Sequence, residues 1–208
     1  MILQKLINPR NTAILVIDIQ NDYCSENGKI AKIRKFDVKS VQKIIPNLIN
    51  FIETARKFKL PIIFTRMIED PKYMKENAKI KIRSSKLPLT LCSPKTWGFE
   101  YYKIKPQKKD VEIIKKTYDA FSNSKLENIL KKMKIKNLII TGVYTAVCVD
   151  TTLRTGFTKG YNIIVPEDLV SMAKEGIYQH DAAIDVWKII FAHVVKSDEI
   201  IETWKKQS

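Results

Sequence analysis

The 208-residue sequence predicts a three-layer α/β domain built on a mainly parallel sheet of six strands. Two observations support this fold class. Six apolar, strand-like runs alternate with segments of helical periodicity, which is the pattern of a parallel sheet covered by helices. The first of these runs, residues 13–18, is apolar without interruption until an acid ends it, as expected for a strand buried on both faces. No repeat, linker or biased tail interrupts the pattern, so we expect a single domain over residues 1–208.

The strands are expected where short apolar runs meet turn signals. The third run ends in a pair of lysines, the fourth ends at a glycine, and the fifth is followed by a Pro-Glu-Asp turn. The six expected strands cover residues 13–18, 60–65, 110–115, 138–143, 161–165 and 191–195.

Helices are expected where apolar residues recur at helical spacing after a capping residue. The pattern predicts helices over residues 37–59, 124–132 and 174–190, one that begins after the fourth strand, and one at the C-terminus. The expected N-caps are Asp37, Ser124 (in a capping box with Glu127), Thr145 and Ser197.

Residues 66–106 lack clear periodicity. Segments of this length inside a compact domain commonly cover a substrate, so we interpret this one as a lid or a subunit interface. Its apolar residues Leu87 and Leu89 are candidates for either role, and Trp97 lies in an aromatic patch that lines a pocket or covers core.

The net charge of +15 raises the question of a nucleic-acid partner. Only six of the 37 basic residues are arginine, the lysines are scattered over every expected helix, and no segment alternates basic and aromatic residues. This distribution favours a solvated surface, with no nucleic-acid partner. The alternative is a non-enzymatic protein whose basic surface binds nucleic acid or an acidic partner in a salt-sensitive way.

Cysteine usage and hydropathy suggest a cytoplasmic protein with no membrane segment. Three cysteines form no paired spacing, so a disulfide framework is not expected. No apolar run approaches the ~20 residues of a membrane span, and the first residues are too polar for a signal peptide.

Chemistry-bearing side chains follow three of the expected strands, and in a parallel sheet such ends meet at one edge. They are Asp18, a lysine at 115 or 116, and Cys148, which falls in the first turn of a helix. A helix N-terminus and a nearby cation stabilise a thiolate, and a carboxylate accepts its proton. We therefore expect a thiol of lowered pKa at Cys148.

Reactivity should separate this thiol from the other two. Fast alkylation of Cys148 at pH 6–7, ahead of Cys24 and Cys92, requires a lowered pKa and would support an enzyme over the non-enzymatic alternative.

Three segments carry a family resemblance. They are residues 18–23 (Asp-Ile-Gln-Asn-Asp-Tyr), 115–121 (Lys-Lys-Thr-Tyr-Asp-Ala-Phe) and 141–149 (Thr-Gly-Val-Tyr-Thr-Ala-Val-Cys-Val). In this order and at these separations, the sequence resembles the isochorismatase-like cysteine hydrolases, nearest in pattern to the ureidoacrylate and N-carbamoyl amidohydrolase branch. The family lysine precedes a Tyr-Ser-Ala-Phe-like element by three positions, which selects Lys115 and makes Lys116 a surface residue.

The resemblance implies an Asp18–Lys115–Cys148 triad that hydrolyses a small linear amide or ureido compound through a thioester. It also implies an oxyanion hole of the Tyr144 and Cys148 backbone N–H groups, a cis peptide bond before Tyr144, and a homodimer or homotetramer. Tyr144, together with Trp97 and Tyr118, is interpreted as a wall of the substrate pocket.

The resemblance also bears on metals. Nicotinamidases of this family bind a metal through an Asp-x-His element and further histidines after the second strand, where this chain has Thr-Arg-Met-Ile-Glu-Asp at residues 65–70. The two histidines, His180 and His193, are interpreted as structural. We therefore expect neither a metal nor a cofactor, with a nicotinamidase-like amidase as an alternative.

Overall fold

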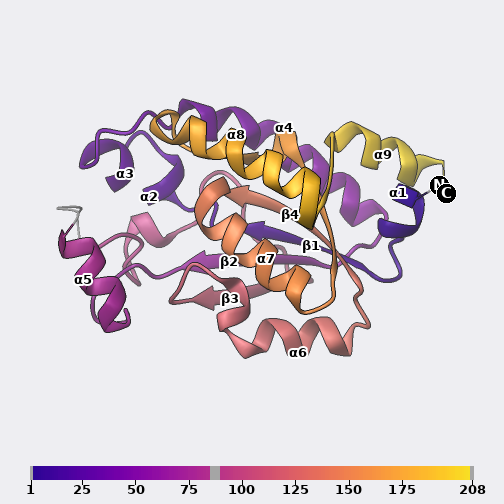
Figure 1. Ribbon diagram of the computed structural model, residues 1–208, viewed down its shortest axis with the longest axis horizontal. Helices are drawn as coiled ribbons and strands as arrows, with labels where there is room; N and C mark the ends of the chain where they lie inside the picture. The colour runs from indigo at the N-terminus through magenta and orange to yellow at the C-terminus, as the bar shows by residue number, and fades with distance from the viewer. Residues whose placement is uncertain (1, 85–89, 207–208) are drawn as a thin grey trace.

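The computed structural model describes residues 2–84 and 90–206, and its strands form one seven-stranded sheet (Figure 1). The strand order is β3-β2-β1-β4-β5-β7, with β6 paired to β4, and every pairing is parallel. The predicted fold class is therefore confirmed. The strands are β1 (Thr12–Ile17), β2 (Ile62–Met67), β3 (Val111–Lys115), β4 (Asn137–Val143), β5 (Asn162–Pro166), β6 (Val170–Ser171) and β7 (His193–Val195).

All six predicted runs form strands, but the predicted count of six misses β6. This strand has two residues, which pair with Gly142 and Val143 at the end of β4. A two-residue strand is too short to show the period-two alternation on which sequence prediction depends.

Helices cover both faces of the sheet (Figure 1). The central strand β1 is buried throughout, and its alternate residues enter two separate clusters, as strand geometry requires. On one face Ile14 and Val16 pack with α1 (Ile2–Leu6), α4 (Lys39–Lys57) and α9 (Ser197–Lys205). On the opposite face the packing helices are α6 (Ser124–Lys132), α7 (Asp150–Thr158) and α8 (Ile177–Val186).

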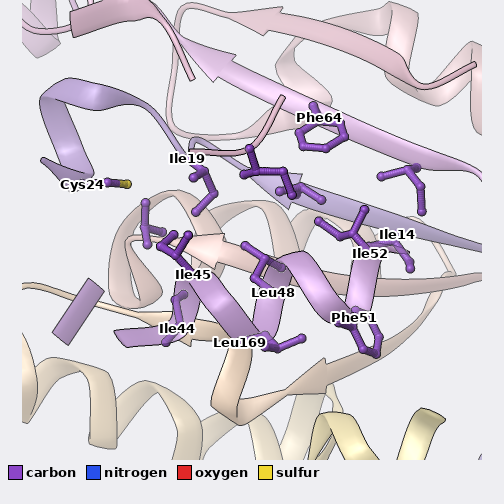
Figure 2. Packing of buried hydrophobic residues seen from close by; sticks show 14 of the residues in the cluster. Ile14, Ile19, Cys24, Ile44, Ile45, Leu48, Phe51, Ile52, Phe64 and Leu169 are labelled. Carbon is purple, nitrogen blue, oxygen red and sulfur yellow. The ribbon is translucent and has the colours of Figure 1, made fainter. Parts of the chain in front are cut away.

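The apolar stripe of α4 forms the largest part of the first cluster. Figure 2 shows this stripe against the strands, and burying each such side chain contributes about 1.5–3 kcal/mol. The side chains involved are Ile44, Ile45, Leu48, Phe51 and Ile52 of α4, with Ile14 of β1 and Phe64 of β2.

The remaining helical elements are short. They are α2 (Asn21–Cys24), α3 (Lys29–Lys32), α5 (Glu76–Ser84), the 3₁₀ turns Trp97–Phe99, Ala120–Ser122, Glu167–Leu169 and Lys174–Gly176, and the π-helical turns Thr145–Val149 and Trp187–Phe191. The helix predicted over residues 174–190 is thus three consecutive pieces around α8. Among the described helices, none has both the length and the apolar character that crossing a membrane requires.

Each of the four predicted helix caps was wrong by one residue, a common error at helix ends. Val38, not Asp37, is at the N-cap of α4, although the Asp37 carboxylate accepts the Lys39 N–H. Asn123, not Ser124, caps α6 by accepting the Lys125 N–H.

Ser197 is the third of these wrong predictions, because it is the first residue of α9 and not its cap. Its hydroxyl and its N–H both donate to Asp168, in the turn that follows β5. The serine therefore fixes α9 to the sheet instead of capping the helix.

The segment over residues 66–106 has one isolated bridge within itself and one to the residues just after β1. Glu69 pairs with Leu91, and Tyr101 pairs with Gln20 just after β1. Leu87 and Leu89 lie outside the described residues, and the lid or interface role remains a prediction.

Candidate active site

The carboxyl ends of three strands place Asp18, Lys115 and Cys148 together. Lys115 Nζ lies 2.7 Å from Asp18 Oδ2, and both side chains are fully buried. The Cys148 thiol is buried next to them, and it interacts with both charges. The neighbouring Lys116 is exposed, so only the first lysine of the pair reaches this group.

Asp18 is held in a fixed orientation by β2. Its φ of 52° lies in the left-handed region, which is uncommon for a residue other than glycine and recurs at functional sites. Thr65 Oγ1 accepts the Asp18 N–H at 3.2 Å and donates to Asp18 Oδ1 at 2.7 Å. The second oxygen, Oδ2, is in ionic contact with Lys115 but receives no well-aligned hydrogen bond from the described residues, so it is free to accept a proton.

Lys115 is fixed as a cation by its surroundings. Its Nζ donates to the carbonyl oxygens of Thr117 and Tyr118, each at 3.2 Å, and contacts Met67 Sδ at 3.6 Å. Burial lowers the pKa of this ammonium, but its interactions with Asp18 and Cys148 outweigh burial and the net pKa is raised. The lysine therefore supplies a permanent positive charge to the site.

Cys148 is carried by the helix that follows β4. The Val143–Tyr144 peptide bond is cis, and the π-helical turn Thr145–Val149 then leads into α7. Gly142 permits this turn, because its φ is +107° and a Cβ there would lie 2.2 Å from the Ile17 carbonyl oxygen. Short π-helical turns of this kind are frequent at functional sites.

The N-terminus of this helix has no side-chain cap. The N-cap residue is Tyr144, so the prediction of Thr145 as the cap was wrong. The Thr145 hydroxyl is instead within 2.7 Å of His180 Nδ1 on α8. Uncapped helix N-termini present N–H groups that bind developing negative charge.

The thiol pKa differs from the sequence-based expectation. Burial raises the pKa of Cys148 well above its ordinary value, Lys115 lowers it, and the charge of Asp18 with its hydrogen bond to the thiol raises it further. This shift is opposite to the expected lowering of the pKa, because the sequence reveals the cation but not the depth of burial. This direction favours the neutral thiol, next to a carboxylate that can take its proton.

A cavity of about 150 Å³ opens onto Cys148. Two of the predicted pocket walls, Tyr118 and Tyr144, line it, whereas Trp97 does not. Trp97 is 53% exposed, and its carbonyl oxygen accepts a hydrogen bond from the Asn21 side chain. The lining residues are Tyr23, Ile30, Arg34, Glu69, Tyr118, Val143, Tyr144, Val147 and Cys148.

Two charged residues of this cavity were missed by sequence reasoning. Glu69 is buried, and its Oε2 accepts a hydrogen bond from the Tyr23 hydroxyl at 3.0 Å. Burial raises the pKa of Glu69, opposed by the charge of Arg34, whose Nη2 lies 3.7 Å from Oε1. The available signals were the position of Glu69 two residues after β2 and the rarity of arginine in a lysine-rich chain.

The histidines and acids do not assemble into a metal site in the part of the chain that the structure describes, where no three His, Cys, Asp or Glu side chains are placed to hold an ion. His180 contacts Thr145, and burial lowers the pKa of its imidazole. His193 is exposed on β7.

Comparison with known proteins assigns the family. A model described as the isochorismatase domain matches residues 12–199. The chain belongs to the isochorismatase family. A ureidoacrylate amidohydrolase of Caulobacter segnis is 31% identical over 193 residues, which cover 86% of this chain and 80% of the relative. This member of the isochorismatase family is thus a hydrolase, as the three sequence segments predicted.

Solved structures of the isochorismatase family share the fold. A cysteine hydrolase from Pseudomonas syringae pv. phaseolicola 1448A has a TM-score of 0.83 at 22% identity, covering 98% of this chain and 96% of that one. The N-carbamoylsarcosine amidase from Thermoplasma acidophilum has a TM-score of 0.73 at 22% identity, covering 90% and 97%.

The buried thiols of this isochorismatase-family protein predict alkaline instability. Burial raises the pKa values of Cys24, Cys92 and Cys148 above the ordinary 9.0. A group with a raised pKa in the folded state stabilises the fold below its unfolded pKa, and this contribution is lost as the pH rises. The free energy of unfolding should therefore fall above about pH 9, by up to about 1.4 kcal/mol per pH unit for each thiol.

Urea unfolding at a series of pH values between neutrality and the alkaline limit measures this slope. Cys24→Ala should reduce the slope because it removes one of the three thiols. A free energy of unfolding that stays constant above pH 9 would contradict the raised pKa values.

Proposed function

We propose that this protein is a metal-independent cysteine amidohydrolase that cleaves the C–N bond of a small linear amide or N-carbamoyl compound. The observation that carries the proposal is that Cys148 lines a small cavity and lies directly beside the buried Asp18–Lys115 pair. Amide-cleaving relatives, named as a ureidoacrylate amidohydrolase and an N-carbamoylsarcosine amidase, support it.

In the first step the Cys148 sulfur attacks the carbonyl carbon while its proton moves to Asp18. The carboxylate lies beside the thiol and can take its proton as the sulfur attacks, so a free thiolate is not needed beforehand. Lys115 remains protonated and balances the negative charge that passes from carboxylate to sulfur to oxygen. The backbone N–H groups of Tyr144 and Cys148, at the uncapped helix end, receive the oxyanion, and one such donor is worth on the order of 10²–10³ in rate.

The second half of the reaction restores the enzyme. The proton on Asp18 passes to the leaving nitrogen, the C–N bond breaks, and ammonia or an amine departs to leave a thioester on Cys148. Asp18 then accepts a proton from water as the water oxygen attacks the thioester. Cleavage of the C–S bond returns that proton to sulfur and releases the acid.

The volume of the cavity limits the substrate to a small molecule. Pockets for drug-sized ligands have about 300–1,000 Å³, whereas this one has about 150 Å³. The aromatic rings of Tyr23 and Tyr144, packed edge to face at 5.8 Å, form part of its wall.

An ammonia-release screen tests the proposal. The panel comprises ureido acids, biuret, nicotinamide and simple aliphatic amides, each with and without a chelator. We expect ammonia from linear ureido or amide compounds, no effect of the chelator, and loss of turnover in parallel with alkylation of Cys148. Turnover that requires a metal, turnover that survives complete alkylation, or no turnover across the panel would each count against it.

A further inference from the structure

Arg34 is a largely buried cation that lines the cavity, and its guanidinium has open hydrogen-bonding positions. The side chain is 13% exposed and lines the same cavity as Cys148. Its one charged neighbour among the described residues is Glu69, at 3.7 Å, which is too long for a hydrogen bond. Its Nε is buried without a partner in the described structure, as are the Nε atoms of Arg56 and Arg66, so the difference between these arginines lies in their terminal nitrogens.

In two other arginines of similar burial, the terminal nitrogens donate hydrogen bonds to carboxylates. Arg66 is 13% exposed and donates to Glu112 at 2.6 Å. Arg56 is 15% exposed and donates to Glu53 and Asp110. This difference from Arg34 is significant, because burying a charged group without hydrogen bonds destabilises a protein by several kcal/mol.

Glu69 does not accept a hydrogen bond from the Arg34 guanidinium. Its Oε2 accepts the Tyr23 hydroxyl, and its Oε1 stays beyond hydrogen-bond distance of the guanidinium. Lys115, the other cation of the site, is already engaged by Asp18 and by two carbonyl oxygens. Arg34 is therefore the cation that this cavity leaves for a ligand.

We propose that Arg34 binds a carboxylate of the substrate, so that the enzyme acts on small amide or ureido acids and discriminates against neutral analogues. The planar fork of a guanidinium matches a carboxylate with two parallel hydrogen bonds. One small molecule placed in the cavity presents its carboxylate to Arg34 and its scissile carbonyl to Cys148. The identity of the cleaved bond rests on the function proposed above; the charge of the substrate rests on Arg34.

The net charge of +15 also favours an anionic substrate. A strongly basic protein raises the local concentration of small anions and increases their association rate, an effect that salt screens. An anionic substrate would give the high net charge a role, which amide hydrolysis alone does not.

The test compares 3-ureidopropionate with n-propylurea, which replaces the carboxylate by a methyl group. Wild type should prefer ureidopropionate in kcat/KM by on the order of 10²-fold, the value of a charge-assisted, bidentate contact. Arg34→Gln should remove this preference, because it lowers kcat/KM for ureidopropionate much more than for propylurea. Rising salt should lower kcat/KM for ureidopropionate only.

Arg56→Gln is the matched control, since it removes an equally buried arginine from the far end of β2 and should not change the preference. If Arg34→Gln does not fold, Arg34→Lys keeps the charge but loses the fork, and should retain only part of the preference. Equal turnover of both compounds, unaffected by either Arg34 variant, would overturn the inference and leave the proposed function intact. If neither compound is hydrolysed, calorimetry with propionate decides: binding to wild type and not to Arg34→Gln supports the anion site, and equal or absent binding overturns it.

Discussion

Replacing Cys148 by alanine is expected to abolish amide hydrolysis while leaving the protein folded. The variant retains the Asp18–Lys115 pair and the helix N-terminus, but no atom remains to form the thioester. Removal of a nucleophile from a comparable assembly costs at least about 10⁴-fold in turnover, since the other groups have nothing to activate. The stability cost should be about 1 kcal/mol, because only one buried sulfur atom is lost.

Ammonia release on the best substrate of the screen and urea unfolding measure the two effects. Cys24→Ala is the matched control, because Cys24 is equally buried but does not line the cavity. It should lose a similar amount of stability and keep its turnover. More than a tenth of wild-type turnover in Cys148→Ala would exclude Cys148 as the nucleophile.

The sequence allowed the convergence of Asp18, Lys115 and Cys148 to be predicted, for a physical reason. Each follows a strongly apolar run, and parallel strands necessarily bring their carboxyl ends to one edge. Strand periodicity and connection length therefore determine which residues meet, even though the residues are far apart in the chain.

The surroundings of these residues could not be predicted in the same way. Arg34 follows the four-residue helix α3 and Glu69 lies in an aperiodic segment, so no repeat pattern places either of them. They enter the cavity through tertiary packing, which local sequence does not encode. The direction of the Cys148 pKa shift was missed for the same reason, since desolvation depends on everything packed around the sulfur.

Replacing Lys115 by methionine is expected to have a large effect on both stability and activity. The ammonium and the Asp18 carboxylate are buried together, and removing one partner leaves the other as an uncompensated buried charge. Such a change typically destabilises a protein by about 3–5 kcal/mol. Turnover should also be lost, because no cation remains to balance the negative charge during attack. Urea unfolding and ammonia release measure the two losses, and Lys116→Met, at the exposed neighbouring position, should change neither.

The double variant Asp18→Asn with Lys115→Met separates the structural role of the pair from its catalytic role. With both charges removed, no buried charge is left unpaired, and neutral replacement of a buried ion pair is often without net cost. Most of the stability lost in Lys115→Met should therefore return, while hydrolysis stays absent because an amide cannot accept the thiol proton. A double variant as unstable as Lys115→Met would show that the lysine stabilises the fold through its contacts with Thr117 and Tyr118 and not through Asp18. Recovery of turnover together with stability would contradict Asp18 as the proton acceptor.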